Sequence, residues 1–141
     1  MKTGIVALLL SLLVLGYFLV RLEPDEDHAQ LQGKWAIESV TQDGSAVGGL
    51  GEEMEFAENQ LTVSTLDGTD LLVSYFNLDP TSKPKILALD RGHREPGSFF
   101  GNCAYELSGD GLKVVSTSPD KRPTEISDKG QVLMTLKRKK R

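Results

Sequence analysis

The stretch that decides the fold is Leu31-Gln32-Gly33-Lys34-Trp35, because it opens a succession of short runs in which apolar and polar residues alternate. Alternation with a period of two is typical of a strand that buries one face. In the first run, Trp35–Thr41, this pattern places Trp35 and Ile37 on one face and Val40 on the other. Gly, Asp, Asn and Pro residues separate the runs, as expected for turns. The chain from residue 31 onward is therefore predicted to be all-β.

Eight such runs are found, and no long helix is predicted among them. Eight antiparallel strands can close into a barrel whose interior is filled by side chains or holds one small ligand. We therefore predict an eight-stranded antiparallel barrel over residues 31–138, with two packed sheets as the alternative, because periodicity alone does not separate the two. The expected strands are Trp35–Thr41, Met54–Ala57, Gln60–Thr65, Asp70–Leu78, Lys85–Leu89, Ser98–Leu107, Leu112–Ser116 and Gln131–Arg138.

An uncharged apolar run, Gly4–Val20, precedes this domain in a chain of 141 residues. It is longer than the apolar part of a secretory signal, roughly 7–15 residues, and no Ala-x-Ala cleavage site follows it. Its length lies at the short end of the range of about 17–25 residues needed to span a bilayer. We predict that residues 1–21 form an N-terminal transmembrane helix, an uncleaved signal-anchor, with a cleaved signal peptide as the alternative. Residues 22–30 are acidic and are predicted to be a tether.

This arrangement predicts where the domain lies. An anchor with a very short N-terminal flank places the domain on the extracytoplasmic side of the membrane. We therefore expect a membrane-anchored domain in the cell envelope, or a secreted one if the signal is cleaved.

Charge is distributed unevenly along the chain. Residues 22–136 carry 20 acidic and 9 basic residues, a net charge of −11, whereas Lys137–Arg141 is entirely basic. An acidic body argues against binding to nucleic acid, which requires a basic surface. Residues 139–141 are predicted to be a basic tail that is solvated after the last strand. Contact of this tail with anionic lipid head groups or other polyanions is the alternative.

Few residues could carry chemistry. Cys103 is the single cysteine, and His28 and His93 are the only histidines, so we expect neither an intramolecular disulfide nor a zinc site. No Ser/His/Asp grouping, phosphate-binding loop or Cys/His pair has a useful spacing. We therefore predict no metal, no cofactor and no enzymatic activity.

Five pieces of the chain, taken in order, resemble a known pattern. The Gly-x-Trp of the first piece is similar to the first strand of lipocalins and other calycins. Together the pieces resemble a lipocalin-like family of uncharacterised small domains that is abundant in planctomycete-type bacteria. The resemblance covers residues 30–138 and implies a barrel fold and an envelope location, without implying a chemistry. The pieces are Leu31–Trp35, Leu78–Lys85, Tyr105–Lys113, Arg122–Glu125 and Gln131–Arg138.

The expected ligand site is the apolar interior of the barrel. Its candidate residues are Phe56, Phe76, Phe99, Tyr105, Val115 and Met134. In a closed barrel the last strand pairs with the first, so Gly33 and Trp35 are expected to meet Arg138 at a closed end. A guanidinium over the Trp35 ring is worth about 0.5–2 kcal/mol.

Two functions are compatible with this sequence. The first is a membrane-tethered lipocalin-like domain that binds a small hydrophobic molecule in its barrel. The alternative is a solid-core envelope module that contacts a protein partner, of unknown identity, or the cell-wall matrix. A ligand-binding barrel requires a cavity, whereas a solid core requires a filled interior and an exposed patch.

Overall fold

The computed structural model describes residues 26–90, 102–118 and 121–140 of the chain. The expected signal-anchor at residues 1–21 and the candidate site residue Phe99 therefore lie outside the described residues, as does Arg141. Within the described part, no helix combines the length and the apolar character needed to cross a membrane.

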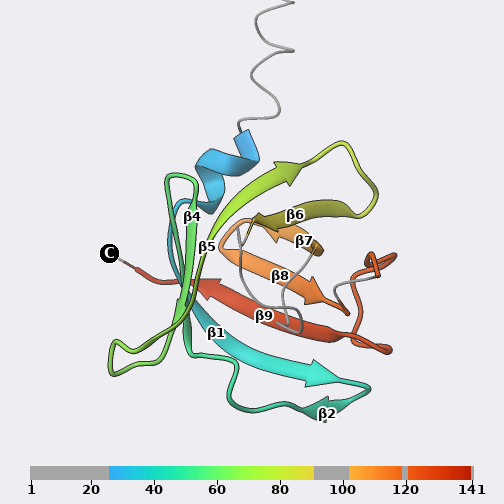
Figure 1. Cartoon of the computed structure of the whole chain (residues 1–141), viewed down its shortest axis with the longest axis horizontal. Coiled ribbons are helices and arrows are strands. Elements are labelled where there is room, and N and C mark those ends of the chain that lie inside the picture. The colour runs from blue at the N-terminus through green and yellow to red at the C-terminus, as the bar shows by residue number, and fades with distance from the viewer. Residues whose placement is uncertain (1–25, 91–101, 119–120, 141) are drawn as a thin grey trace, which may run out of the picture.

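Nine strands lie in the described ranges, and eight of them form a closed ring (Figure 1). All pairings are antiparallel, and β1 closes the ring by pairing with both β3 and β9. The predicted eight-stranded barrel is confirmed. The additional strand β2, which lies outside the ring and pairs antiparallel with the end of β1, was not predicted. The strands are β1 (Gly33–Gln42), β2 (Ser45–Ala46), β3 (Glu53–Ala57), β4 (Gln60–Ser64), β5 (Asp70–Asp79), β6 (Lys85–Asp90), β7 (Asn102–Ser108), β8 (Gly111–Ser116) and β9 (Val132–Arg138).

Alternation along the strands builds the core. In β3, Met54 and Phe56 are buried in the barrel, whereas the residues that flank them are more exposed. Leu61 and Val63 of β4 pair with these two residues and share their face. Burying a side chain of this size stabilises the fold by about 1.5–3 kcal/mol. Closure of the ring also removes the free strand edges that would otherwise invite aggregation.

Strand β1 departs from simple alternation. Its register against β9 shifts between Ile37 and Ser39. An extra residue at such a bulge moves the following side chains to the opposite face. As a result, Val40 packs against the core together with Ile37, whereas Ser39 is exposed. The prediction that Val40 faces away from Trp35 is therefore wrong.

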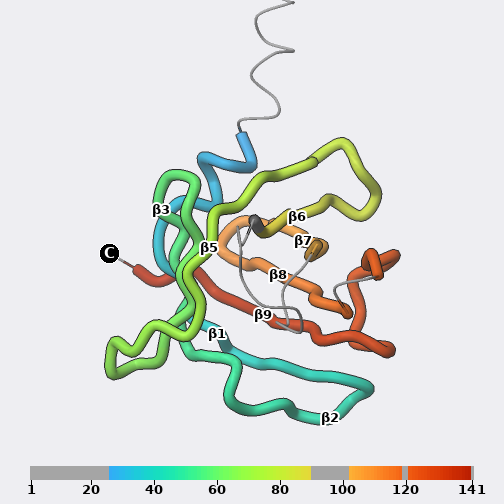
Figure 2. Tube along the Cα trace, viewed as in Figure 1, coloured from blue at the N-terminus to red at the C-terminus, as the bar shows by residue number. Residues whose placement is uncertain are grey.

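A short helix, residues 26–31, precedes β1 and lies beside the β3–β4 hairpin (Figures 1 and 2). Leu31 at its end is 1% exposed and belongs to the core. The Gln32 side chain donates to the Glu58 carbonyl at 2.9 Å and accepts from the Glu58 N–H at 2.7 Å. Residues 26–30, which the sequence assigned to the tether, therefore belong to the folded domain.

Candidate functional site

Aromatic side chains gather at one end of the barrel, under residues 26–31. The Phe76 ring stacks on His28 with 5.6 Å between ring centroids, and it meets Phe56 edge-on at 5.2 Å. Such edge-on and stacked pairs add to the stabilisation from burial. We call this end, which carries residues 26–31, the sealed end. The buried aromatic residues in the described part of the chain are Trp35, Phe56, Phe76 and Tyr105.

Trp35 is the centre of the sealed end. Its side chain is completely buried, and its indole Nε1 donates to the carbonyl of Leu31 at 2.9 Å. The Arg138 guanidinium lies over the ring, 4.3 Å from its centroid, which is the contact expected from the sequence. The same guanidinium donates to the carbonyls of Gln30 and Gln32 and so fixes the helix to the last strand.

Gly33 allows the chain to turn from the helix into β1. Its φ angle of 115° lies in a region that residues with a side chain rarely adopt. An added Cβ would lie 3.9 Å from the Arg138 guanidinium, which is an ordinary contact. The backbone conformation, rather than a lack of space, therefore requires glycine here.

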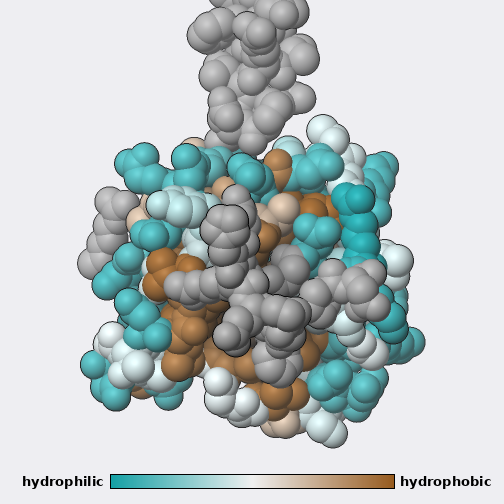
Figure 3. Space-filling model, in the orientation of Figure 1, coloured by the Kyte–Doolittle hydropathy of each residue, from teal (hydrophilic) through white to brown (hydrophobic). Residues whose placement is uncertain are grey.

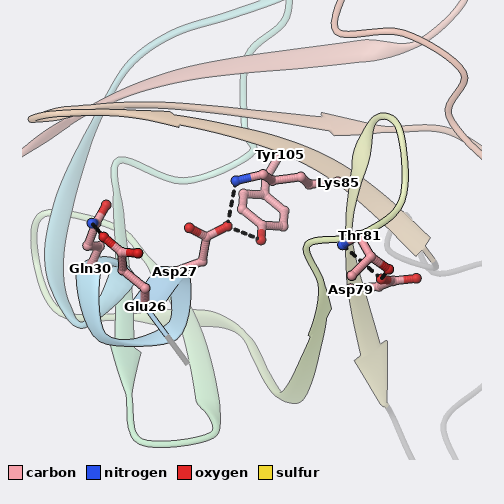
Figure 4. A network of polar contacts seen from close by, with 7 residues as sticks. All are labelled: Glu26, Asp27, Gln30, Asp79, Thr81, Lys85 and Tyr105. Carbon is pink, nitrogen blue, oxygen red and sulfur yellow. Dashed lines mark hydrogen bonds and ion pairs between the residues drawn. The ribbon is translucent and has the colours of Figure 1, made fainter. Parts of the chain in front are cut away.

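A partly buried polar network joins the helix to the barrel wall (Figure 4). Asp27 accepts hydrogen bonds from the Lys85 ammonium at 2.9 Å and from the Tyr105 hydroxyl at 2.7 Å. Burial raises the pKa of Asp27, but the hydrogen bonds and the Lys85 charge together hold it below its ordinary value. Burial and the bond to Asp27 raise the pKa of Tyr105, so the phenol stays protonated and donates.

The Asp27 network predicts a pH-dependent contribution to stability. A carboxyl whose pKa is lowered by folding stabilises the protein above its unfolded pKa, near 3.9, and loses this contribution as the pH falls through the folded pKa. We expect Asp27→Asn to lower the free energy of unfolding at neutral pH by about 1–3 kcal/mol, as for other hydrogen bonds to charged groups. The difference from the wild type should shrink below a pH of about 4. Urea unfolding across this pH range measures both quantities.

Exposed Asp70, at the start of β5, offers a control with the same change of charge. Asp70→Asn should change the free energy of unfolding by less than about 0.5 kcal/mol, as is usual for surface substitutions. A difference between Asp27→Asn and the wild type that stays constant as the pH falls would contradict the role assigned to Asp27.

The structure brings four of the six expected ligand-site residues together in the barrel interior. Phe56, Phe76, Tyr105 and Met134 belong to one buried cluster. Phe99 lies outside the described residues.

The placement of Val115 in the barrel interior is wrong. In β8, Val114 pairs with the inward-facing Tyr105 and Met134, so its neighbour Val115 points to the outer face of the sheet. There it pairs with Ala104, and both are fully buried. Adjacent valines that are buried on opposite faces carry no sequence signal that distinguishes inside from outside.

The opposite end of the barrel, which we call the far end, is filled differently. Its inner face is formed where β8 ends and where β5, β7 and β9 begin. These positions carry small or aliphatic side chains, in contrast with the aromatic rings of the sealed end. They are Leu72, Ser74, Cys103, Ser116 and Val132, all of them less than one-tenth exposed.

The described residues contain no group of three or more His, Cys, Asp or Glu side chains that could hold a metal ion. The Asp27, Lys85 and Tyr105 network consists of ordinary acid–base groups, yet its hydrogen bonds are made to one another. Comparison with known proteins adds no relative: no family model, no curated protein and no solved structure matches this sequence.

Proposed function

We propose that this chain is a membrane-tethered, extracytoplasmic lipocalin-like domain of the cell envelope that binds a small apolar molecule inside the far end of its barrel. The apolar run Gly4–Val20 supports the tether, and the closed eight-stranded barrel supports the lipocalin-like architecture. The observation that carries the ligand proposal is the difference in side-chain size between the two ends of the barrel interior.

The spacing between strands in a sheet is nearly constant, so a closed barrel has a similar cross-section along its axis. Each cross-section must therefore be filled to a similar extent. At the sealed end, the cross-section is filled by Leu31 and by the four buried aromatic rings described above. Serine, cysteine and valine side chains at the far end have much smaller volumes, so the proposal assigns the rest of this cross-section to a bound molecule. An apolar wall with a few hydroxyl groups, such as those of Ser74 and Ser116, is typical of a small-molecule site.

A substitution that enlarges a far-end side chain tests this proposal. Val132 lies on the inner face, two residues before Met134. Val132→Phe should weaken binding of the fluorescent fatty acid cis-parinaric acid by about tenfold, a loss of about 1.4 kcal/mol. If the far end has room, the added ring should leave the free energy of unfolding nearly unchanged. In a filled interior the same ring would cost about 1–3 kcal/mol.

Val73 provides a matched control, because it lies on the outer face of β5, between the exposed residues Leu71 and Tyr75. Val73→Phe should leave parinaric acid binding unchanged. Failure of the wild type to bind the probe, together with destabilisation by Val132→Phe, would reject the ligand proposal. Native mass spectrometry of the full chain isolated from its own envelope would then identify the cargo or show the bare protein.

The second candidate function is a solid-core module that contacts another protein, and an exposed apolar surface favours it. Leu71 and Tyr75 on the outer face of β5 are 49% and 64% exposed, and Leu66 in the preceding turn is 73% exposed. Apolar residues also gather on the left and lower middle of the face in Figure 3, with hydrophilic residues around its rim. Exposed apolar patches of this kind often mark protein contacts.

A further inference from the structure

A basic groove lies at the sealed end, beside the start of β1 and the end of β9. We infer that this groove binds the phosphate groups of anionic lipids, so that the sealed end faces the membrane and the far end faces away from it. The inference rests on the proposed function, because the membrane tether enters the domain at this end. The groove has a volume of about 810 Å³ and is lined by residues 32 and 33 together with Lys34, Asp110, Lys137, Arg138, Lys139 and Lys140.

Backbone contacts hold the groove in shape. The Lys139 N–H donates to the Lys34 carbonyl at 2.9 Å, which continues the β1–β9 pairing beyond the end of β9. The Arg138 N–H donates to the Asp110 carbonyl at 2.8 Å, and this contact brings in the β7–β8 turn. Lys137 and Arg138 belong to the last strand, as predicted, and Lys139 continues along the barrel wall, whereas the sequence predicts that residues 139–141 form a solvated tail.

The cations of the groove differ in how far they are neutralised. Lys34 and Lys139 lie 3.7 and 2.7 Å from carboxylate oxygens of Glu53, and Arg138 lies 3.4 Å from Asp110. Within the described residues, Lys137 and Lys140 make no ion pair, and both side chains are exposed. These two ammonium groups can therefore pair with an external anion without breaking an internal contact.

The path of the chain explains why a membrane is the favoured occupant. The structure describes a helix from residue 26, and its rise places this residue only about 9 Å along the axis from residue 32, at the edge of the groove. Four residues, 22–25, separate this helix from Arg21, so five steps of about 3.6 Å allow at most about 18 Å between Arg21 and residue 26. If the apolar run spans a bilayer, the groove thus stays within about 27 Å of the head groups. It can therefore approach them to within the Debye length of about 10 Å, where the charges attract each other.

The charge of the domain adds a preferred orientation. Residues 22–136 carry a net charge of −11, so an anionic surface repels most of the barrel and attracts only the basic groove. Near an anionic membrane surface, each lysine raises the binding constant by about fivefold. Reversal of both unpaired lysines should therefore remove the preference for anionic lipid.

Trp35 provides the readout, because it is the only tryptophan and lies beneath Arg138 at the groove. The full chain is reconstituted with dansyl-labelled vesicles of phosphatidylcholine alone, or of phosphatidylcholine mixed with phosphatidylglycerol. We expect more energy transfer from Trp35 to the dansyl lipid in the mixed vesicles. The double variant Lys137→Glu/Lys140→Glu should reduce the transfer to its value in phosphatidylcholine.

A matched control reverses two exposed lysines in the segment that joins β8 to β9, Lys121→Glu/Lys129→Glu. It changes the net charge equally and should leave the transfer unchanged. Equal transfer in the two lipid mixtures, or equal losses in the two double variants, would overturn the inference. The inference would also be overturned if the groove preferred a soluble polyanion. In that case the chain would bind heparin through Lys137 and Lys140, and the energy transfer would not depend on the lipid.

Flotation with pure phosphatidylcholine vesicles separates this inference from the proposed tether. A chain that floats with them but shows no lipid-dependent transfer keeps its tether and loses the groove assignment. A chain that does not float with them, yet binds phosphatidylglycerol vesicles through Lys137 and Lys140, loses the tether and keeps the groove assignment.

Discussion

Replacement of Trp35 by alanine is expected to lower the free energy of unfolding by about 3–5 kcal/mol, the range for a buried tryptophan. The side chain is completely buried, so its removal leaves a large cavity at the sealed end. Two further contacts are lost with it, the hydrogen bond to the Leu31 carbonyl and the Arg138 guanidinium over the ring. Arg138 would keep its hydrogen bonds to the helix but would lie over a void.

Urea unfolding followed by circular dichroism measures this loss, because the variant has no tryptophan fluorescence. Trp35→Phe separates the two contacts, because it keeps an aromatic ring under Arg138 but loses the indole N–H. It should therefore lower the free energy of unfolding by less than the alanine variant does. Tyr75→Ala on the outer face of β5, where the side chain is 64% exposed, should stay within about 0.5 kcal/mol of the wild type. An unchanged unfolding midpoint for Trp35→Ala would reject the placement of Trp35 as the plug of the barrel.

Strand positions and the closed ring were predictable because each strand carries its own pattern. Leu61 and Val63 alternate with polar residues in the sequence, and the structure buries both. The contact between Trp35 and Arg138 was also predictable, because closure pairs the first strand with the last and these residues lie near the start of one and the end of the other. Both predictions depend on local alternation and on one topological rule.

The features that were missed depend on contacts between distant residues. Residues 26–31 show no strand pattern and are acidic, yet Asp27 is held by Lys85 and Tyr105, which lie 58 and 78 residues further along the chain. The β1 bulge that turns Val40 inward is set by the register with β9. Neither a distant partner nor a one-residue shift can be read from a short run of residues.

The candidate site was predicted in composition but not in its distribution along the barrel. Phe56, Phe76, Tyr105 and Met134 were assigned to the interior, and all four lie there. Which end of the barrel each side chain occupies depends on the stagger between strands, and the sequence does not show this stagger. The contrast between an aromatic sealed end and a far end with small side chains therefore became visible only in the structure.

Leu31→Ala is expected to lower the free energy of unfolding by about 2–5 kcal/mol, the range for a buried leucine. Leu31 is 1% exposed and packs into the barrel core from the end of the short helix, so its loss opens a cavity between the helix and the barrel. It also loosens the backbone whose carbonyl accepts the Trp35 hydrogen bond. Urea unfolding of the full chain, followed by Trp35 fluorescence, measures the effect.

Leu66→Ala is the matched control, because Leu66 is 73% exposed and the same atoms are removed without leaving a cavity. It should change the free energy of unfolding by less than about 0.5 kcal/mol. A Leu31→Ala variant as stable as this control would show that residues 26–31 contribute no packing and act as a tether. A large loss confined to Leu31→Ala means that the helix closes the sealed end, and the barrel is then incomplete without residues 26–31.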